Sequence, residues 1–214
     1  MTEQTTTRSA ASDRPRIKQH NSVWPAPPRI AGLLAVTALA VGAVVRVVLS
    51  RLTRSDVPAP PARPLTREEA EDRFYDLREL AKDCFNAGEI RKARAYAQEL
   101  MAITPQYEGN WNYGNAVHDA NMVLGRIALR AGRIDDAKGY LLAAGASPGS
   151  PQMNSFGPNM SLAKDLLEKG ERHVVLAYFE LCRQFWELHG GRLDEWRRLI
   201  DAGAIPDFGA NLLY

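Results

Sequence analysis

The sequence predicts an all-α domain built from paired helices, preceded by one membrane-spanning helix. After residue 70, a small residue, a glycine and a second small residue recur three times, separated by 7 and then 5 residues. Ahead of this region, residues 30–45 carry no charge. Recurrence at fixed offsets is typical of stacked helical hairpins, and a long uncharged apolar run is typical of a helix in lipid.

Charge is divided unevenly along the 214 residues. Residues 1–65 contain nine Lys or Arg and three Asp or Glu, a net charge of +6, whereas the rest holds 18 basic and 22 acidic residues, a net charge of −4. Nucleic-acid binding needs a basic face that neutralises phosphates. The weakly acidic C-terminal part therefore predicts no nucleic-acid partner.

The apolar run predicts a transmembrane helix at residues 30–50. As a helix it would reach about 31 Å, against about 30 Å for the hydrocarbon core of a bilayer. Arg46 lies about one turn from its end, so the long side chain can reach the headgroups. A cleavable signal peptide is disfavoured because a long polar stretch precedes the run and Arg51 and Arg54 follow it. A buried core helix is disfavoured by the prolines on both sides.

The segments on either side of this helix have different compositions. Residues 1–29 form a polar, basic tail that we expect to be disordered. Residues 51–65 form a Pro-rich linker that favours the extended polyproline II conformation. Basic residues flank both ends of the helix, so the positive-inside rule discriminates weakly. Because a charged tail is hard to translocate, we expect a bacterial inner-membrane protein with its C-terminal domain outside the cytoplasm.

The folded domain begins with a clear helix signal. Thr66 and Glu69 form a predicted capping box, in which each residue satisfies a backbone N–H of the other. Gly88 ends the first helix, since glycine adopts the left-handed conformation without steric cost. A second helix runs from Ile90 to Pro105. The first helix buries an apolar stripe with helical spacing, made of Phe74, Leu77, Leu80, Ala81, Cys84 and Phe85.

Three units of this kind resemble the 34-residue tetratricopeptide repeat (TPR) in residue type and spacing. The first carries Leu80-Ala81, Gly88, Ala93 and Pro105; the second Leu124-Gly125, Gly132, Ala137 and Pro148; the third Leu162-Ala163, Gly170 and Val175. The resemblance implies TPR-like helical hairpins over residues 66–190. The units start 44 and 38 residues apart, which predicts inserted loops at residues 106–114 and 149–159. Residues 114–126 and 148–171 also resemble a group of poorly characterised bacterial repeat proteins.

Residues 191–214 are expected to cap the repeat stack. Apolar residues with helical spacing predict one more helix from Leu193 to Ala202. The final residues are apolar for a chain end, and we expect them to dock on the stack, because the end of a solenoid needs covering. The alternative is that they bind something else. These residues are Phe208, Leu212, Leu213 and Tyr214.

Candidate catalytic patterns have simpler explanations. Residues 145–149 match the G-x-S-x-G pattern of a hydrolase, but a predicted helix precedes Ser147 and Pro148 has no N–H for an oxyanion hole. Asn115, His118 and Asn121 share one predicted helix face. They are interpreted as partners of loop backbone groups rather than as a polar site.

No metal or cofactor site is predicted. The four histidines include no i,i+4 pair, and no C-x-x-C occurs. Cys84 and Cys182 fall at core positions of their units and are interpreted as small buried hydrophobes; two cysteines this far apart do not identify a redox compartment. We therefore expect no enzyme and no small-molecule substrate.

One candidate binding site remains. The resemblance implies that the first helices of the units project cations toward an inner groove, where TPR-like domains often bind peptides, and a basic groove favours an acidic or carboxylate-bearing protein segment. The alternative is a solvated face neutralised by neighbouring Asp and Glu. We expect a membrane-anchored interaction module, with an accessory subunit of a larger membrane complex as the alternative. The groove residues are Arg78, Lys82, Arg126, Arg130 and Lys164.

Overall fold

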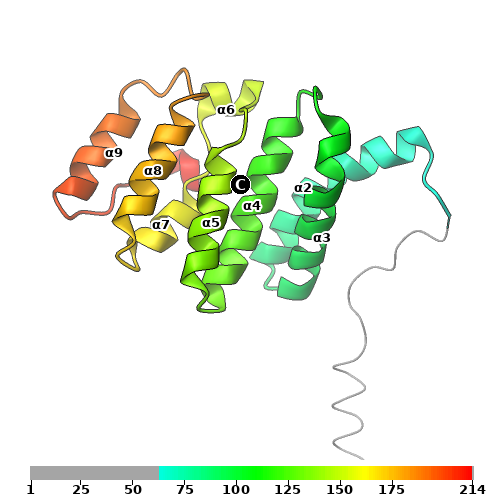
Figure 1. Ribbon diagram of the computed structural model, residues 1–214, viewed down its shortest axis with the longest axis horizontal. Coiled ribbons are helices and arrows are strands. Elements are labelled where there is room, and N and C mark those ends of the chain that lie inside the picture. Colours follow the sequence, from blue (N-terminus) through cyan, green and yellow to red (C-terminus); the bar gives the residue numbers. More distant parts are fainter. Residues whose placement is uncertain (1–62, 214) are drawn as a thin grey trace, which may run out of the picture. The chain divides into compact units, whose positions relative to one another are not determined.

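The computed structural model describes residues 63–213. Within this range the chain forms eight α-helices and two 3-10 helices, with no β-strand (Figure 1). The predicted tail 1–29, the predicted membrane helix 30–50 and most of the linker 51–65 lie outside the described residues. Among the helices between residues 63 and 213, none has the length and apolar character needed to cross a bilayer.

The first two helices begin and end where the sequence predicts. Helix α2 spans Arg67–Asn86 and α3 spans Ile90–Ile103. The capping box is confirmed: the Thr66 N–H donates to Glu69 Oε2 at 2.8 Å, and the Glu69 N–H donates to Thr66 Oγ1 at 3.3 Å. Gly88 has a φ of +78° between the two helices, as its predicted role requires.

The later helices continue the pairwise arrangement. Helix α4 packs on α5, and α7 packs on α8, while α3 contacts α4 and α5 contacts α8 across neighbouring pairs. The domain is therefore an all-α stack of sequential helix pairs. The remaining bounds are η1 Thr104–Tyr107, α4 Tyr113–Arg130, α5 Ile134–Gly145, α6 Pro151–Phe156, α7 Ser161–Leu167, α8 Arg172–Cys182, α9 Arg192–Asp201 and η2 Gly209–Leu212.

Small residues recur because the helices approach one another closely. A Cβ atom on Gly125 would lie 2.3 Å from Leu162 Cδ2 and 3.0 Å from Tyr140 Cβ. Ala81 and Ala93 are buried together in the cluster between α2, α3 and α4. A larger side chain at these positions would separate helices that now bury apolar surface against each other.

The second predicted insertion is not a loop throughout. Residues 149–159 contain the short helix α6, whose N-cap Ser150 accepts a hydrogen bond from the Met153 N–H at 3.0 Å. Pro151 occupies the first helical position, where its missing N–H costs nothing. The serine–proline pair is a helix-start signal that the spacing argument overlooked.

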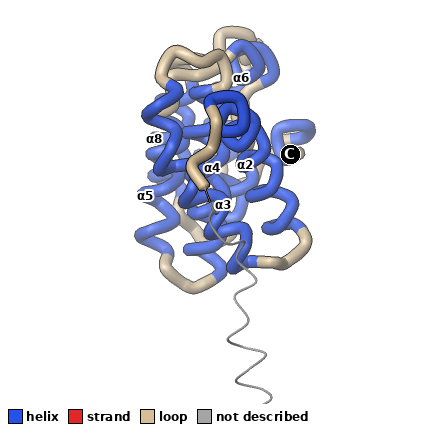
Figure 2. Tube along the Cα trace, turned by 90° about the vertical axis from the view of Figure 1, so that its right-hand side faces the viewer, coloured by secondary structure: helices blue, strands red, loops and turns tan. Residues whose placement is uncertain are grey.

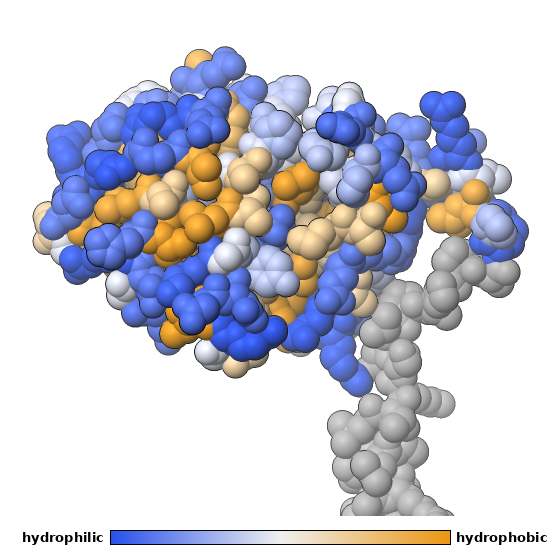
Figure 3. Space-filling model, in the orientation of Figure 1, coloured by the Kyte–Doolittle hydropathy of each residue, from blue (hydrophilic) through white to orange (hydrophobic). Residues whose placement is uncertain are grey.

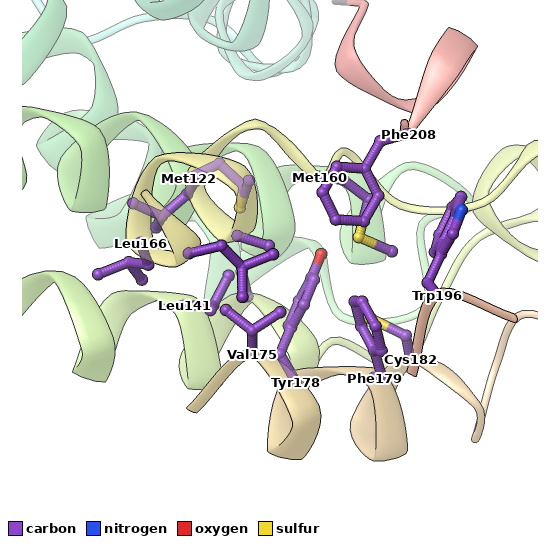
Figure 4. Packing of buried hydrophobic residues seen from close by; sticks show 14 of the residues in the cluster. Met122, Leu141, Met160, Leu166, Val175, Tyr178, Phe179, Cys182, Trp196 and Phe208 are labelled. Carbon is purple, nitrogen blue, oxygen red and sulfur yellow. The ribbon is translucent and has the colours of Figure 1, made fainter. Parts of the chain in front are cut away.

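The C-terminal part caps the stack as expected. Helix α9 matches the predicted Leu193–Ala202 to within one residue at each end. Phe208 is only 2% exposed, and its ring centroid lies 4.9 Å from that of Trp196. Figure 4 shows Phe208 and Trp196 with Phe179 in the core shared with α8. Docking of the final residues is thus confirmed for Phe208, whereas Leu213 is exposed.

The end of the described chain returns to the middle of the stack. Figure 2 shows α5 and α8 on one side and the helical turn beside the C-terminal label on the other, with α4 between them. We call the side of α2 and α4 on which η2 lies the inner face. The opposite side, formed by α5 and α8, is the outer face.

Candidate functional site

A cleft of about 380 Å³ lies on the inner face. Its walls come from α2, α4, the segment at residues 152–159, the start of α9 and η2. Residues more than 130 positions apart therefore meet in one site. We call this hollow the inner cleft.

Asp119 on α4 forms the charged floor of the inner cleft. Its Oδ2 lies 3.0 Å from Arg78 Nε and 3.4 Å from Lys82 Nζ, and its Oδ1 lies 3.0 Å from His118 Nδ1. Burial alone would raise the pKa of Asp119. The hydrogen bond with His118 and the charges of His118, Arg78 and Lys82 outweigh burial and hold that pKa well below its usual range. Asp119 is therefore a buried carboxylate compensated from two helices.

Polar side chains extend this cluster to other elements. Arg78 Nη1 and Asn115 Nδ2 both donate to Asn112 Oδ1 at 2.8 Å. Ser150, the N-cap of α6, donates from Oγ to Asn115 Oδ1 at 2.7 Å. On the other side, His118 Nε2 lies 3.2 Å from the Tyr178 hydroxyl on α8. The network thus joins α2, α4, α6 and α8.

The interpretation of Asn115, His118 and Asn121 as partners of loop backbone groups is wrong for all three. Asn121 Nδ2 donates to the Val117 carbonyl of its own helix at 2.7 Å. Asn115 and His118 instead bond side chains of other elements and line the inner cleft. Their three-residue spacing correctly indicated a shared polar face, but the sequence did not show that α6 and α8 pack over it.

The rim of the inner cleft is apolar and partly exposed. Phe156 is 74% exposed and Leu213 is 76% exposed, and both line the cleft. Arg192 also lines it, with its guanidinium 5.6 Å from the centre of the Trp186 ring. Among residues 63–213, no carboxylate lies within 4.0 Å of Arg192. The cleft therefore combines a polar floor, an apolar rim and a cation that has no acidic partner in the described chain.

The five predicted groove cations divide into different environments. Arg78 and Lys82 line the inner cleft. Arg126 instead pairs with Asp165 at 2.8 Å, and both Arg126 and Arg130 lie over the Phe85 ring, at 4.8 and 4.0 Å from its centre. Lys164 pairs with Glu168, which caps the C-terminal end of the same helix. These last three do not line the described cleft.

Arg192 is the cleft cation that the sequence argument missed. It lies in the C-terminal cap, outside the repeat alignment from which the groove was predicted. The only local signal is its position at the start of α9, directly after Gly190-Gly191. Arg192 reaches the cleft because α9 packs back against the stack. No local sequence pattern predicts that packing.

Three side chains of residue types used in catalysis, His118, Ser147 and Cys182, are held by protein partners or buried. Both ring nitrogens of His118 face protein partners, Asp119 and Tyr178. Ser147 donates from Oγ to the Gly114 carbonyl at 2.8 Å and accepts from the Gly149 N–H at 3.2 Å, so its hydroxyl stabilises the turn after α5. Burial raises the pKa of the Cys182 thiol well above its usual range, which disfavours the thiolate.

The described residues also contain no candidate metal site. Within residues 63–213, no three His, Cys, Asp or Glu side chains are grouped so that they would hold a metal ion. Cys182 is buried, as predicted, and Cys84 is only partly buried.

Comparisons of the chain with models of known families, with curated proteins and with solved structures give no match.

Proposed function

We propose that this chain is a non-catalytic, membrane-anchored interaction module whose TPR-like helix pairs present the inner cleft to a protein or peptide partner. The membrane anchor is the helix predicted at residues 30–50. The module acts as a scaffold or recruiter at the bacterial inner membrane, with the helical domain outside the cytoplasm. The partner contributes a segment that bears a carboxylate and an apolar side chain.

The recurring small residues support the TPR-like part of this proposal. Ala81, Gly125 and Ala163 occupy the same offset in the three predicted units, and each lies on the first helix of a pair. A close approach at equivalent places is what a stacked repeat requires, because each pair buries its apolar surface only against its neighbours.

The observation that carries the binding proposal is the combination of Arg192 with an exposed apolar rim in one cleft. Among the described lining residues, the cations are Arg78, Lys82 and Arg192, and the carboxylate is Asp119. Arg78 and Lys82 also pair with Glu79, at 3.8 and 2.9 Å, so Arg192 is the cation that favours an anionic partner. Phe156 supplies an aromatic surface that a partner would remove from water.

Photocrosslinking tests the proposal in the full chain. A benzoylphenylalanine at position 156 should capture a partner in native membranes, and Arg192→Glu should reduce that capture at least about tenfold, because a repulsive charge replaces an attractive one. Arg197→Glu on the same helix is the matched control, since Arg197 pairs with Glu180 outside the cleft. Equal capture by the two variants, or no captured protein at all, would refute the proposed site.

The outer face favours the alternative function of an accessory subunit. Leu142, Val174 and Leu181 are half-buried on α5 and α8, and Ala143 and Ala177 between them are exposed. Figure 3 shows apolar residues gathered over these helices. A permanent subunit would pack this face against its complex.

The two functions predict different behaviour of an outer-face variant. In mild detergent, Ala177→Glu should shift the full chain out of a large assembly if the outer face is a permanent interface. It should leave capture at position 156 unchanged if the chain works through the inner cleft. Native gel mobility and crosslinking yield, measured on the same sample, decide between them.

A further inference from the structure

The chain's own C-terminal segment is bound along one edge of the inner cleft. Asn211 Nδ2 donates to the carbonyls of Phe156 at 3.1 Å and Pro158 at 3.0 Å. In return, the Met160 N–H donates to the Asn211 carbonyl at 2.7 Å. These backbone groups belong to residues 156–160, which we call the docking edge.

The docking edge is shaped for this contact. Gly157 has a φ of +92°, and a Cβ atom there would lie 2.7 Å from Asn211 Nδ2 and 2.4 Å from the Trp186 ring. Only glycine permits this approach. Asn159 also contributes, since its Nδ2 donates to the Leu213 carbonyl at 3.2 Å while its Oδ1 accepts from the Ser161 N–H at 2.8 Å. Backbone groups within residues 156–160 and the Asn159 side chain thus all bond to the C-terminal segment.

The attachment of the C-terminal segment changes at Gly209. Phe208 is anchored in the core against Trp196 and Phe179. Beyond it, Asn211 is 8% exposed and held by hydrogen bonds, while Leu213 is largely exposed at the rim. Gly209 has a φ of +50° at the junction. Between Asn211 and Leu213, Leu212 is partly buried against the core, so one apolar contact and a few polar contacts hold the segment, and its release leaves the Phe208 anchor in place.

We propose that the docking edge is a binding site for a peptide that forms a short helical turn, and that residues 210–213, which lie in and just after the 3-10 turn η2, are its intramolecular occupant. The inference rests on the proposed function and names the class of partner: a segment with an asparagine and an apolar residue two positions later, as in Asn211 and Leu213. The asparagine amide bridges the carbonyls of Phe156 and Pro158. The partner binds after the C-terminal segment has left the edge.

The cations of the cleft lie beside the residues that a partner segment would replace. Ala210, Asn211 and Leu213 line the same hollow as Arg78 and Arg192. A partner segment that replaces them therefore lies beside the cations of the cleft. The docking edge selects the asparagine through backbone groups, and the cations select the carboxylate that the proposed function requires.

A fluorescent peptide with the sequence of residues 208–213 tests the proposal on the full chain in detergent. The Asn211→Ala chain should bind it at least about tenfold more tightly than the wild type, because the competing segment loses two hydrogen bonds. The peptide that itself carries Asn211→Ala should bind at least about tenfold more weakly. Ile205→Ala is the control, since Ile205 is exposed and lies outside the docking edge.

Hydrogen exchange shows whether the variant keeps its fold. In Asn211→Ala, the Met160 amide should exchange faster, while amides of α9 should keep their wild-type rates. Equal peptide affinity for the wild type and Asn211→Ala, equal affinity for the two peptides, or dimerisation by exchange of C-terminal segments would each overturn the proposal. Capture at position 156 is a separate result, so a captured partner without any peptide effect would leave the proposed function standing.

Discussion

Two pairs of basic residues have the same spacing but opposite surroundings. Arg78 and Lys82 on α2 are nearly buried and share Asp119 of the next pair. Arg126 and Arg130 on α4 lie over Phe85 of the preceding pair. Spacing of four residues places two cations on one helix face, but the neighbouring helix decides whether the two share a buried carboxylate or an aromatic ring. The first pair therefore belongs to the cleft, and the second holds two helix pairs together.

The largest difference between the two regions should follow from removing their acids. Asp119→Asn removes the buried carboxylate that Arg78 and Lys82 share and leaves these cations paired with the exposed Glu79, so it should lower the free energy of unfolding by about 3 to 5 kcal/mol. Asp165→Asn removes the partner of Arg126 from a site that is 31% exposed, and should cost about 1 kcal/mol or less. Urea unfolding followed by circular dichroism measures both. Similar losses for the two variants would show that Asp119 is not a buried compensating charge.

Acid should distinguish the same two positions by pH dependence. The pKa of Asp119 is lowered by folding, so its stabilising contribution is complete above about pH 4, its unfolded pKa. That contribution is lost as the pH falls toward the lowered folded value. The melting temperature of the wild type should therefore fall toward that of Asp119→Asn as the pH drops below about 4.

Glu69 does not disturb this acid comparison. Its hydrogen bonds with Arg63 and then Thr66 lower its pKa to about 2, but it is present in both proteins, so its effect cancels. Parallel melting curves for the wild type and Asp119→Asn between pH 6 and 2 would contradict the charge assignment of Asp119.

A smaller effect than that of Asp119→Asn should come from the aromatic side of the comparison. Phe85→Leu keeps an apolar side chain under Arg126 and Arg130 but removes the ring that both cations face, and should cost about 1 to 2 kcal/mol. A double-mutant cycle with Arg130→Gln should give a coupling energy of about 0.5 to 1 kcal/mol. Zero coupling in thermal unfolding would mean that the guanidinium packs there without attraction to the ring.

Local features of this fold were predictable from the sequence. The capping box at Thr66 and Glu69, the turn at Gly88 and helix α9 depend on contacts within a few residues, so short patterns are enough. The burial of Phe208 followed from a simple argument, that the apolar end of a stack needs cover. Helix α6 was not predicted, because it is only six residues long and its Ser150-Pro151 start signal lies within a segment that the repeat spacing assigns to a loop.

The site was less accessible to sequence reasoning because it depends on distant contacts. Arg78 and Lys82 line the inner cleft, but nothing near them in sequence indicates that Asp119 would take up their charge. Arg192 and Asn211 reach the cleft only after the chain has folded back from α9. Periodicity assigns a residue to a helix face, whereas the partner across the interface comes from another part of the chain.

The ion pair between Asp119 and the cations of α2 has a consequence for how this domain can be shortened. Many repeat arrays tolerate loss of a terminal unit, because neighbouring units meet mainly through apolar surface. Here, cutting away α2 and α3 would strand a carboxylate on α4 without the guanidinium and ammonium groups that neutralise it. The first helix pair is thus an electrostatic requirement of the second, and fragments intended for expression should retain both α2 and α3.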